Sequence, residues 1–192
     1  MTMKVLNLYE IRDRARTSGR SVYTTQQLAQ LLNKPRAIVN VYASRLVEKG
    51  LATRALRGRI SFTDDDFVVA SQLFEPAYVS MTSALNFHNI ITQVPAYVEC
   101  VSPKNSRRYE HLGIIYHKIP PSLFFGYEKH KKSESYAFVA TPEKALIDWV
   151  YLNQPPPSII DEIRKNLNDE KLQQYIDQFS SRGSKKIRRW LE

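Results

Sequence analysis

The N-terminal fold is decided by residues 24–50, which read TTQQLAQLLNKPRAIVNVYASRLVEKG. The start of this stretch predicts a helix, because threonines followed two or three residues later by glutamine resemble a capping box. Asn33, Lys34 and Pro35 predict a tight turn, since Asn tolerates a left-handed backbone and Pro favours the first position of a new helix. A second helix over 35–49 is expected to stop at Gly50.

The second helix divides its side chains between two faces. One face is apolar and is expected to pack on the neighbouring helices; it holds Val39, Ala43 and Leu46. Another face carries Arg36, Asn40 and Ser44 at helical spacing. Arg binds guanine and Asn binds adenine through paired hydrogen bonds, and Ser can reach a base or a phosphate. Lys34 and Arg36 also lie at the helix N-terminus, where backbone amides attract phosphate.

The flanking segments complete the order of elements. Apolar residues at helical spacing predict a helix over 4–16, and residues 21–23 predict a very short strand. Residues 51–63 predict two strands that turn at Gly58. Helix, short strand, helix, turn, helix and two-stranded hairpin is the order of a winged helix-turn-helix. We therefore expect residues 1–66 to form a winged helix-turn-helix that binds DNA.

Positive charge is concentrated in the same region. The chain has a formal net charge of +9; residues 1–63 hold twelve Lys or Arg against three Asp or Glu, whereas residues 64–192 hold sixteen of each sign. Arg57 and Arg59 lie at the expected hairpin tip, from which they could enter a minor groove or bind phosphate. This asymmetry indicates a basic module for a polyanion, joined to a neutral module with another task.

Residues 67–192 predict a second domain of mixed α/β structure, with a small sheet and C-terminal helices, so that the whole chain is expected to be α+β. Strands are expected at 78–80, 96–101, 112–117, 122–127 and 136–140. Helices are expected at 67–74, at 82–88, from Thr141 onward, at 158–167 and at 169–179. Residues 126–135 are hydrophilic and are expected to be exposed. A basic loop carries possible secondary contacts at Lys104, Arg107 and Arg108.

Residues that could support catalysis show no recognised spacing. The four histidines lack metal-ligand spacing, and the lone Cys100 is expected to be a buried apolar residue. The consecutive aspartates 64–66 favour a helix start over a magnesium site. Glu143 and Lys144 resemble the end of a nuclease motif, but a helix-capping Glu beside an exposed Lys is the preferred interpretation. The sequence therefore predicts no enzymatic activity, no metal and no cofactor.

The composition is typical of a soluble globular protein, with 43% hydrophobic and 24% charged residues. No apolar run approaches the ~20 residues needed to span a bilayer, and the first ten residues lack a secretory signal pattern. We expect a cytoplasmic protein that does not bind membranes.

Three stretches beyond the first domain resemble the AbiEi family: residues 77–88, 97–101 and 139–148, the last containing TPEKALID. AbiEi proteins join an N-terminal winged helix to a C-terminal domain of this kind, and they are antitoxins of type IV toxin–antitoxin systems linked to abortive phage infection. The resemblance implies a transcriptional autorepressor that binds repeats in its own promoter. It also implies neutralisation of a nucleotidyltransferase-like toxin without a stable complex.

The family resemblance carries DNA contacts over to residues of the winged helix, namely Lys34, Arg36, Asn40, Ser44, Arg57 and Arg59. The antitoxin function is assigned, as a hypothesis, to the basic loop over 102–108. Three alternatives stay open: a winged helix that binds protein, a nuclease-like enzyme that uses carboxylates of 64–66 or 143–148, and a regulator without a toxin partner. A protein-binding winged helix predicts that Arg36→Ala and Asn40→Ala leave DNA affinity unchanged.

Overall fold

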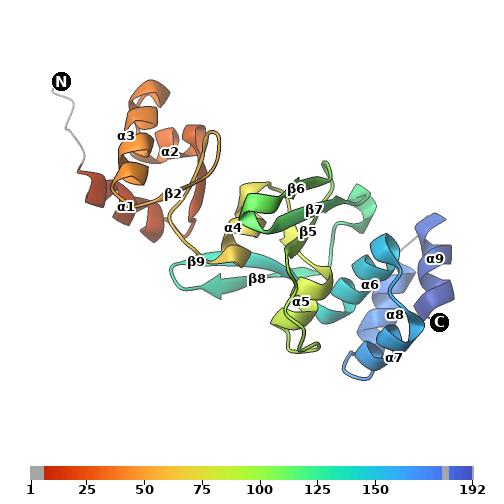
Figure 1. The fold of residues 1–192 in the computed structure, drawn as a ribbon. Coiled ribbons are helices and arrows are strands. Elements are labelled where there is room, and N and C mark those ends of the chain that lie inside the picture. The colour runs from red at the N-terminus through yellow and green to blue at the C-terminus, as the bar shows by residue number, and fades with distance from the viewer. Residues whose placement is uncertain (1–6, 179–181, 192) are drawn as a thin grey trace. The chain divides into compact units, whose positions relative to one another are not determined.

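The computed structural model describes residues 7–178 and 182–191. The chain divides into two compact units (Figure 1). The first unit comprises the chain up to Phe74 together with His130–Ala137, and the second comprises Glu75–Lys129 and the chain from Phe138 onward. Helices and two separate sheets make up the described residues, so the fold has the expected α+β class.

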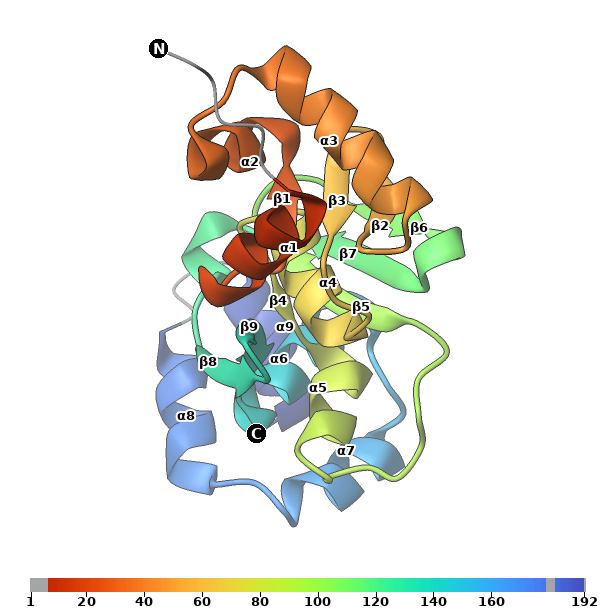
Figure 2. The ribbon, with the colours of Figure 1, turned by 90° about the vertical axis from the view of Figure 1, so that its left-hand side faces the viewer.

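The first unit follows the order of elements that the sequence predicts. Its elements are α1 (Leu8–Thr17), β1 (Val22–Thr24), α2 (Thr25–Leu32), α3 (Arg36–Glu48), β2 (Thr53–Leu56), β3 (Arg59–Ser61) and α4 (Asp66–Leu73). The three strands form one antiparallel sheet in the order β1-β3-β2. Figure 2 shows α1, α2 and α3 grouped around β1 and β3.

Local capping explains where α2 and α3 begin. The Thr24 side chain accepts a hydrogen bond from the backbone N–H of Gln27, and the Gln27 side chain accepts one from the N–H of Thr24, which forms the capping box. Asn33 ends α2 in the left-handed region, with φ of 49°. Pro35 is extended and precedes α3, so the helix begins at Arg36, one residue later than predicted.

The core of the first unit lies where the three helices meet the sheet. Ile11, Leu28, Val39 and Leu46 are completely buried. Burial of such side chains stabilises a fold by about 1.5–3 kcal/mol each, so the apolar face of α3 holds that helix on the other two. Ala43, which was expected on this face, is only partly buried, because it lies at the edge of the helix contact.

The first unit extends beyond the predicted boundary at residue 66, since α4 belongs to it. Asp65 caps α4 by accepting a hydrogen bond from the N–H of Val68, so the aspartates do begin a helix. The buried Gln72 side chain fixes α4 in place: its Oε1 accepts hydrogen bonds from the N–H groups of Ser21 and Val22, at 3.0 and 3.1 Å. Its Nε2 donates to the Tyr136 carbonyl at 2.8 Å. Gln72 therefore joins β1 to Tyr136, which lies 64 residues further along the chain.

The elements that follow α4 are β4 (Tyr78–Val79), α5 (Met81–Phe87), β5 (Val98–Ser102), β6 (Arg107–Tyr109), η1 (Glu110–Leu112), β7 (Ile114–Lys118), η2 (Pro121–Leu123), β8 (Tyr127–Lys132), β9 (Ser135–Ala140), α6 (Pro142–Asn153), α7 (Pro157–Arg164), α8 (Asp169–Asp177) and α9 (Arg182–Leu191). The strands form a mixed sheet in the order β6-β7-β5-β4-β9-β8. β5 pairs with β7 in parallel and with β4 antiparallel. Cys100 on β5 is buried, as expected.

The predictions for one strand and two loops of this sheet were wrong. The predicted strand at 122–127 is replaced by η2 and by β8 at Tyr127–Lys132, within the stretch expected to be an exposed loop. β6 at Arg107–Tyr109 lies in the predicted basic loop. Both strands are at the edges of the sheet, where charged side chains are common because they protect an unpaired edge. Their hydrophilic sequences therefore lack the apolar alternation that indicates a half-buried strand.

The start of α6 agrees with the prediction from the sequence, but the burial of a side chain in its first turns does not. Thr141 caps the helix and Pro142 occupies its first turn, as predicted. Lys144, expected to be exposed, is completely buried and forms an ion pair with Asp148. Asp148 also accepts hydrogen bonds from the hydroxyl groups of Tyr78, at 3.0 Å, and Ser80, at 2.7 Å. The capping threonine and the following proline therefore predicted the helix start, whereas no local pattern predicted the burial of Lys144.

Within the described residues, no helix combines the length and the apolar character needed to cross a bilayer.

Candidate nucleic-acid interface

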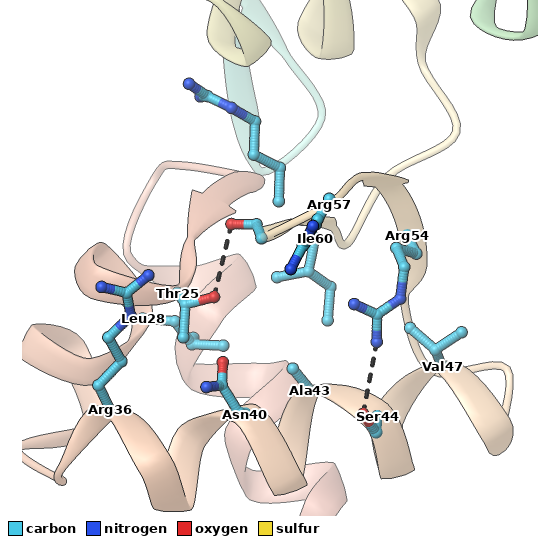
Figure 3. Close-up of a pocket in the computed structure, with 12 residues that line it drawn as sticks. Thr25, Leu28, Arg36, Asn40, Ala43, Ser44, Val47, Arg54, Arg57 and Ile60 are labelled. Atoms are coloured by element: carbon cyan, nitrogen blue, oxygen red, sulfur yellow. Dashed lines mark hydrogen bonds between the residues drawn. The ribbon is translucent and has the colours of Figure 1, made fainter.

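A basic groove lies in the first unit between α3 and the β2–β3 hairpin (Figure 3). It has a volume of about 540 Å³, and we call it the α3 groove. Its polar lining is contributed by seven residues: Thr25, Arg36, Asn40, Ser44, Arg54, Arg57 and Arg59. None of the described residues that line it is acidic. Four guanidinium groups without a carboxylate give the groove a positive potential that suits an anionic ligand.

α3 supplies one wall of the groove. Arg36, Asn40 and Ser44 follow one another by four residues, so they share one face of the helix, as predicted. The buried residues Val39 and Leu46 hold the opposite face against the core. Because α3 is anchored by its core face, Arg36, Asn40 and Ser44 are held on a fixed backbone and point into the groove, towards the hairpin (Figure 3).

The hairpin supplies the other wall and is tied to α2. Gly58 occupies the turn with φ of 75°, in the left-handed region that favours glycine. Its carbonyl accepts a hydrogen bond from the Thr25 N–H at 3.1 Å, and the Thr25 hydroxyl lies 3.5 Å from the same oxygen. The tip that carries Arg57 and Arg59 is therefore attached to the start of α2, which fixes the width of the groove.

The structure adds Arg54 to the predicted residues. Arg54 lies on β2 and is exposed, and its Nη2 is 3.4 Å from the hydroxyl oxygen of Ser44. This contact joins the two walls of the α3 groove. Arg54 was not among the predicted residues because it lies in the body of the strand, and its position opposite α3 depends on the register of β2 with β3.

Lys34 lies apart from the α3 groove. It lines a shallow hollow of about 500 Å³ at the turn between α2 and α3, together with Gln26 and Gln30. Arg36 lines both hollows, so the two surfaces meet at the N-terminus of α3. The arrangement gives five of the six predicted residues one common groove and leaves the sixth beside it.

The predicted secondary contacts belong to the second unit, and two of them are engaged within it. The Lys104 ammonium donates a hydrogen bond to the Glu75 carbonyl at 2.7 Å. The Arg108 guanidinium lies over the Tyr97 ring, 4.4 Å from its centroid, and 3.2 Å from a carboxylate oxygen of Glu110. These contacts compete with an external ligand, so the basic loop is a weaker candidate surface than the α3 groove.

Three of the carboxylates considered for nuclease-like chemistry, those of Asp65, Glu143 and Asp148, make structural contacts. Asp148 is paired with Lys144 and is 1% exposed, which leaves no access for a substrate. Glu143 accepts a hydrogen bond from the Asn168 N–H at 3.2 Å and lies 3.5 Å from the Lys171 ammonium. Among the described residues, no group of three or more His, Cys, Asp or Glu is arranged to hold a metal ion.

No known family model matches the chain, and no curated protein matches it.

Proposed function

We propose that the first unit is a winged helix-turn-helix that binds double-stranded DNA. In this proposal α3 lies in the major groove, and the β2–β3 hairpin contacts the adjacent backbone or minor groove. The observation that carries the proposal is the composition of the α3 groove, which gathers four arginines with Asn40 and Ser44 and contains no acidic residue.

The chemistry of the groove favours DNA over a protein partner. The major groove of B-DNA admits an α-helix, and its base edges offer acceptors to Arg36 and a paired donor and acceptor to Asn40. Arginines at a hairpin tip suit phosphates or a narrow minor groove, where the negative potential is strongest. Lys34, at the turn before α3, is suited to a phosphate contact that fixes the position of the helix without specifying sequence.

We further propose that the chain is a sequence-specific transcriptional regulator acting on its own promoter. The resemblance of residues 77–88 and 139–148 to AbiEi antitoxins supports this role, and it extends the proposal to neutralisation of a nucleotidyltransferase-like toxin. The second unit would then carry the antitoxin function.

Fluorescence anisotropy with two labelled duplexes tests DNA binding. One duplex is the DNA upstream of the coding sequence, and the other is a shuffled duplex of equal length and composition. We expect preferential binding to the upstream duplex, with affinity falling about a thousandfold between about 50 and 200 mM salt, because several phosphates are neutralised. Arg36→Ala and Asn40→Ala should each reduce the preference by about tenfold, whereas Arg57→Ala should weaken both duplexes alike.

Lys165→Ala is the matched control, since it removes an exposed positive charge from the second unit. Equal, weak binding of the wild type to both duplexes would leave only a basic surface and would contradict the proposal. Preference that survives both Arg36→Ala and Asn40→Ala would place recognition outside α3 and point to a protein-binding role for the α3 groove.

A further inference from the structure

Val41 is an exposed aliphatic residue on α3. Its relative exposure is 50%, whereas Val39 and Leu46 on the same helix are completely buried. A β-branched side chain is less favourable than alanine in a helix, and an exposed valine gains nothing from the core in return. Core packing of the first unit therefore does not explain the valine at this position.

Helix geometry places Val41 beside the polar face of α3. At about 100° per residue, Asn40, Ser44, Ala37 and Val41 all point away from the buried side of the helix. Ala37 and Val41 are four residues apart and both exposed, so they form a short apolar strip. That strip runs alongside the row formed by Asn40 and Ser44, which is drawn in Figure 3.

The major groove of DNA presents a matching pair of chemical groups. Adenine offers the N6 donor and N7 acceptor that an asparagine binds, and thymine offers a C5-methyl group that projects into the same groove. We propose that Val41, supported by Ala37, contacts the methyl group of a thymine beside the adenine bound by Asn40. The inference rests on the proposed function and deepens it, because it makes Val41 a specificity-determining residue and requires a thymine beside that adenine in the DNA site.

The test changes only the methyl group. A duplex selected by the protein from a random-sequence pool is resynthesised with single thymines replaced by deoxyuridine, which lacks the C5-methyl but keeps the base pairing. At one thymine, we expect deoxyuridine to weaken wild-type binding by about fourfold, the factor for one buried methyl group. In Val41→Ala the same replacement should have almost no effect, because the two partners of the contact are then both absent.

Two controls make the result specific. Val94→Ala removes a valine that is 78% exposed in the second unit, and it should leave the deoxyuridine effect at about fourfold. Val41→Ala should fold normally, because alanine is the better helix former at an exposed position. Circular dichroism of the Val41→Ala variant checks that its folding is unchanged.

The outcomes separate the inference from the proposed function. Selective, salt-dependent binding in which every deoxyuridine has the same effect on wild type and Val41→Ala overturns the thymine contact and leaves DNA binding intact. Failure to select any duplex from the pool overturns the proposed function, and the thymine contact with it.

Discussion

At the scale of single residues, stability depends strongly on the buried ion pair of Lys144 and Asp148. Both residues lie on the buried side of α6, and the Lys144 ammonium is 5.1 Å from the centroid of the Phe125 ring. Burial lowers the pKa of Lys144, although Asp148 acts in the opposite direction. A buried charge that loses its partner is destabilising, whereas the loss of both charges is less so.

A double-mutant cycle at this pair tests that account. Asp148→Asn should lower the free energy of unfolding by about 3–5 kcal/mol, because it leaves the ammonium without a counter-ion. The double variant Lys144→Met with Asp148→Asn should lose less than Asp148→Asn alone, since no buried charge remains. Urea unfolding followed by tryptophan fluorescence measures both, because Trp149 and Trp190 lie in the second unit. Losses that simply add would show that the two residues are not coupled.

At the scale of elements, the β2–β3 hairpin depends on the turn at Gly58 and on its attachment to α2. A Cβ atom added at Gly58 would meet only the Thr25 hydroxyl, at 4.0 Å, so there is space for a side chain. The constraint is the backbone, because φ is 75°. The shape of the hairpin is thus set by one conformational requirement and one backbone hydrogen bond.

Two substitutions at Gly58 separate backbone strain from size. Gly58→Ala should reduce the free energy of unfolding of the first unit by about 1–2 kcal/mol, since an L-residue with a Cβ is strained at positive φ. Gly58→Asn should cost less, because asparagine tolerates the left-handed region although it is the larger side chain. Urea unfolding followed by circular dichroism measures both. A ranking by side-chain size, with Asn worse than Ala, would mean that space rather than backbone conformation is limiting.

At the scale of the whole molecule, buried groups that keep their protons link stability to pH. Burial raises the pKa of Tyr78 well above its usual value of 10.0, and Asp148 beside it adds to the effect. Burial also raises the pKa of the Cys100 thiol, whose usual value is 9.0. Above these usual values the unfolded chain releases protons that the folded chain keeps, so stability falls as pH rises. The lowered pKa of Lys144 opposes this trend below its usual value of 10.5.

We therefore expect Cys100 to lower the stability of the second unit as pH rises above about 9, by up to about 1.4 kcal/mol per pH unit. Cys100→Ala should lower stability at neutral pH through lost packing, but its stability should fall less steeply between about pH 9 and 10.5. Urea unfolding across this range, followed by tryptophan fluorescence, compares the two slopes. Parallel curves for wild type and Cys100→Ala would contradict a proton kept by the buried thiol.

The distance along the chain between interacting residues explains which features could be predicted. Thr24, Asn33 and Gly58 act on backbone groups within a few residues, so their patterns predicted the helix starts and the turn. The spacing of Arg36, Asn40 and Ser44 predicted one wall of the α3 groove, because residues four apart share a helix face. Arg54 was missed, since its position against Ser44 requires the hairpin to fold back on α3.

The sequence by itself determined the order of elements in the first unit, the capping residues and the confinement of the excess positive charge to the first 63 residues. Only the tertiary structure decided that Gln72 joins β1 across 50 positions, that Tyr78 meets Asp148 across 70, and that Lys144 is buried. The physical reason is range: caps, turns and helix faces are set by interactions within about four residues. Contacts between distant residues depend on how the completed helices and sheet pack together, and no local pattern records that packing.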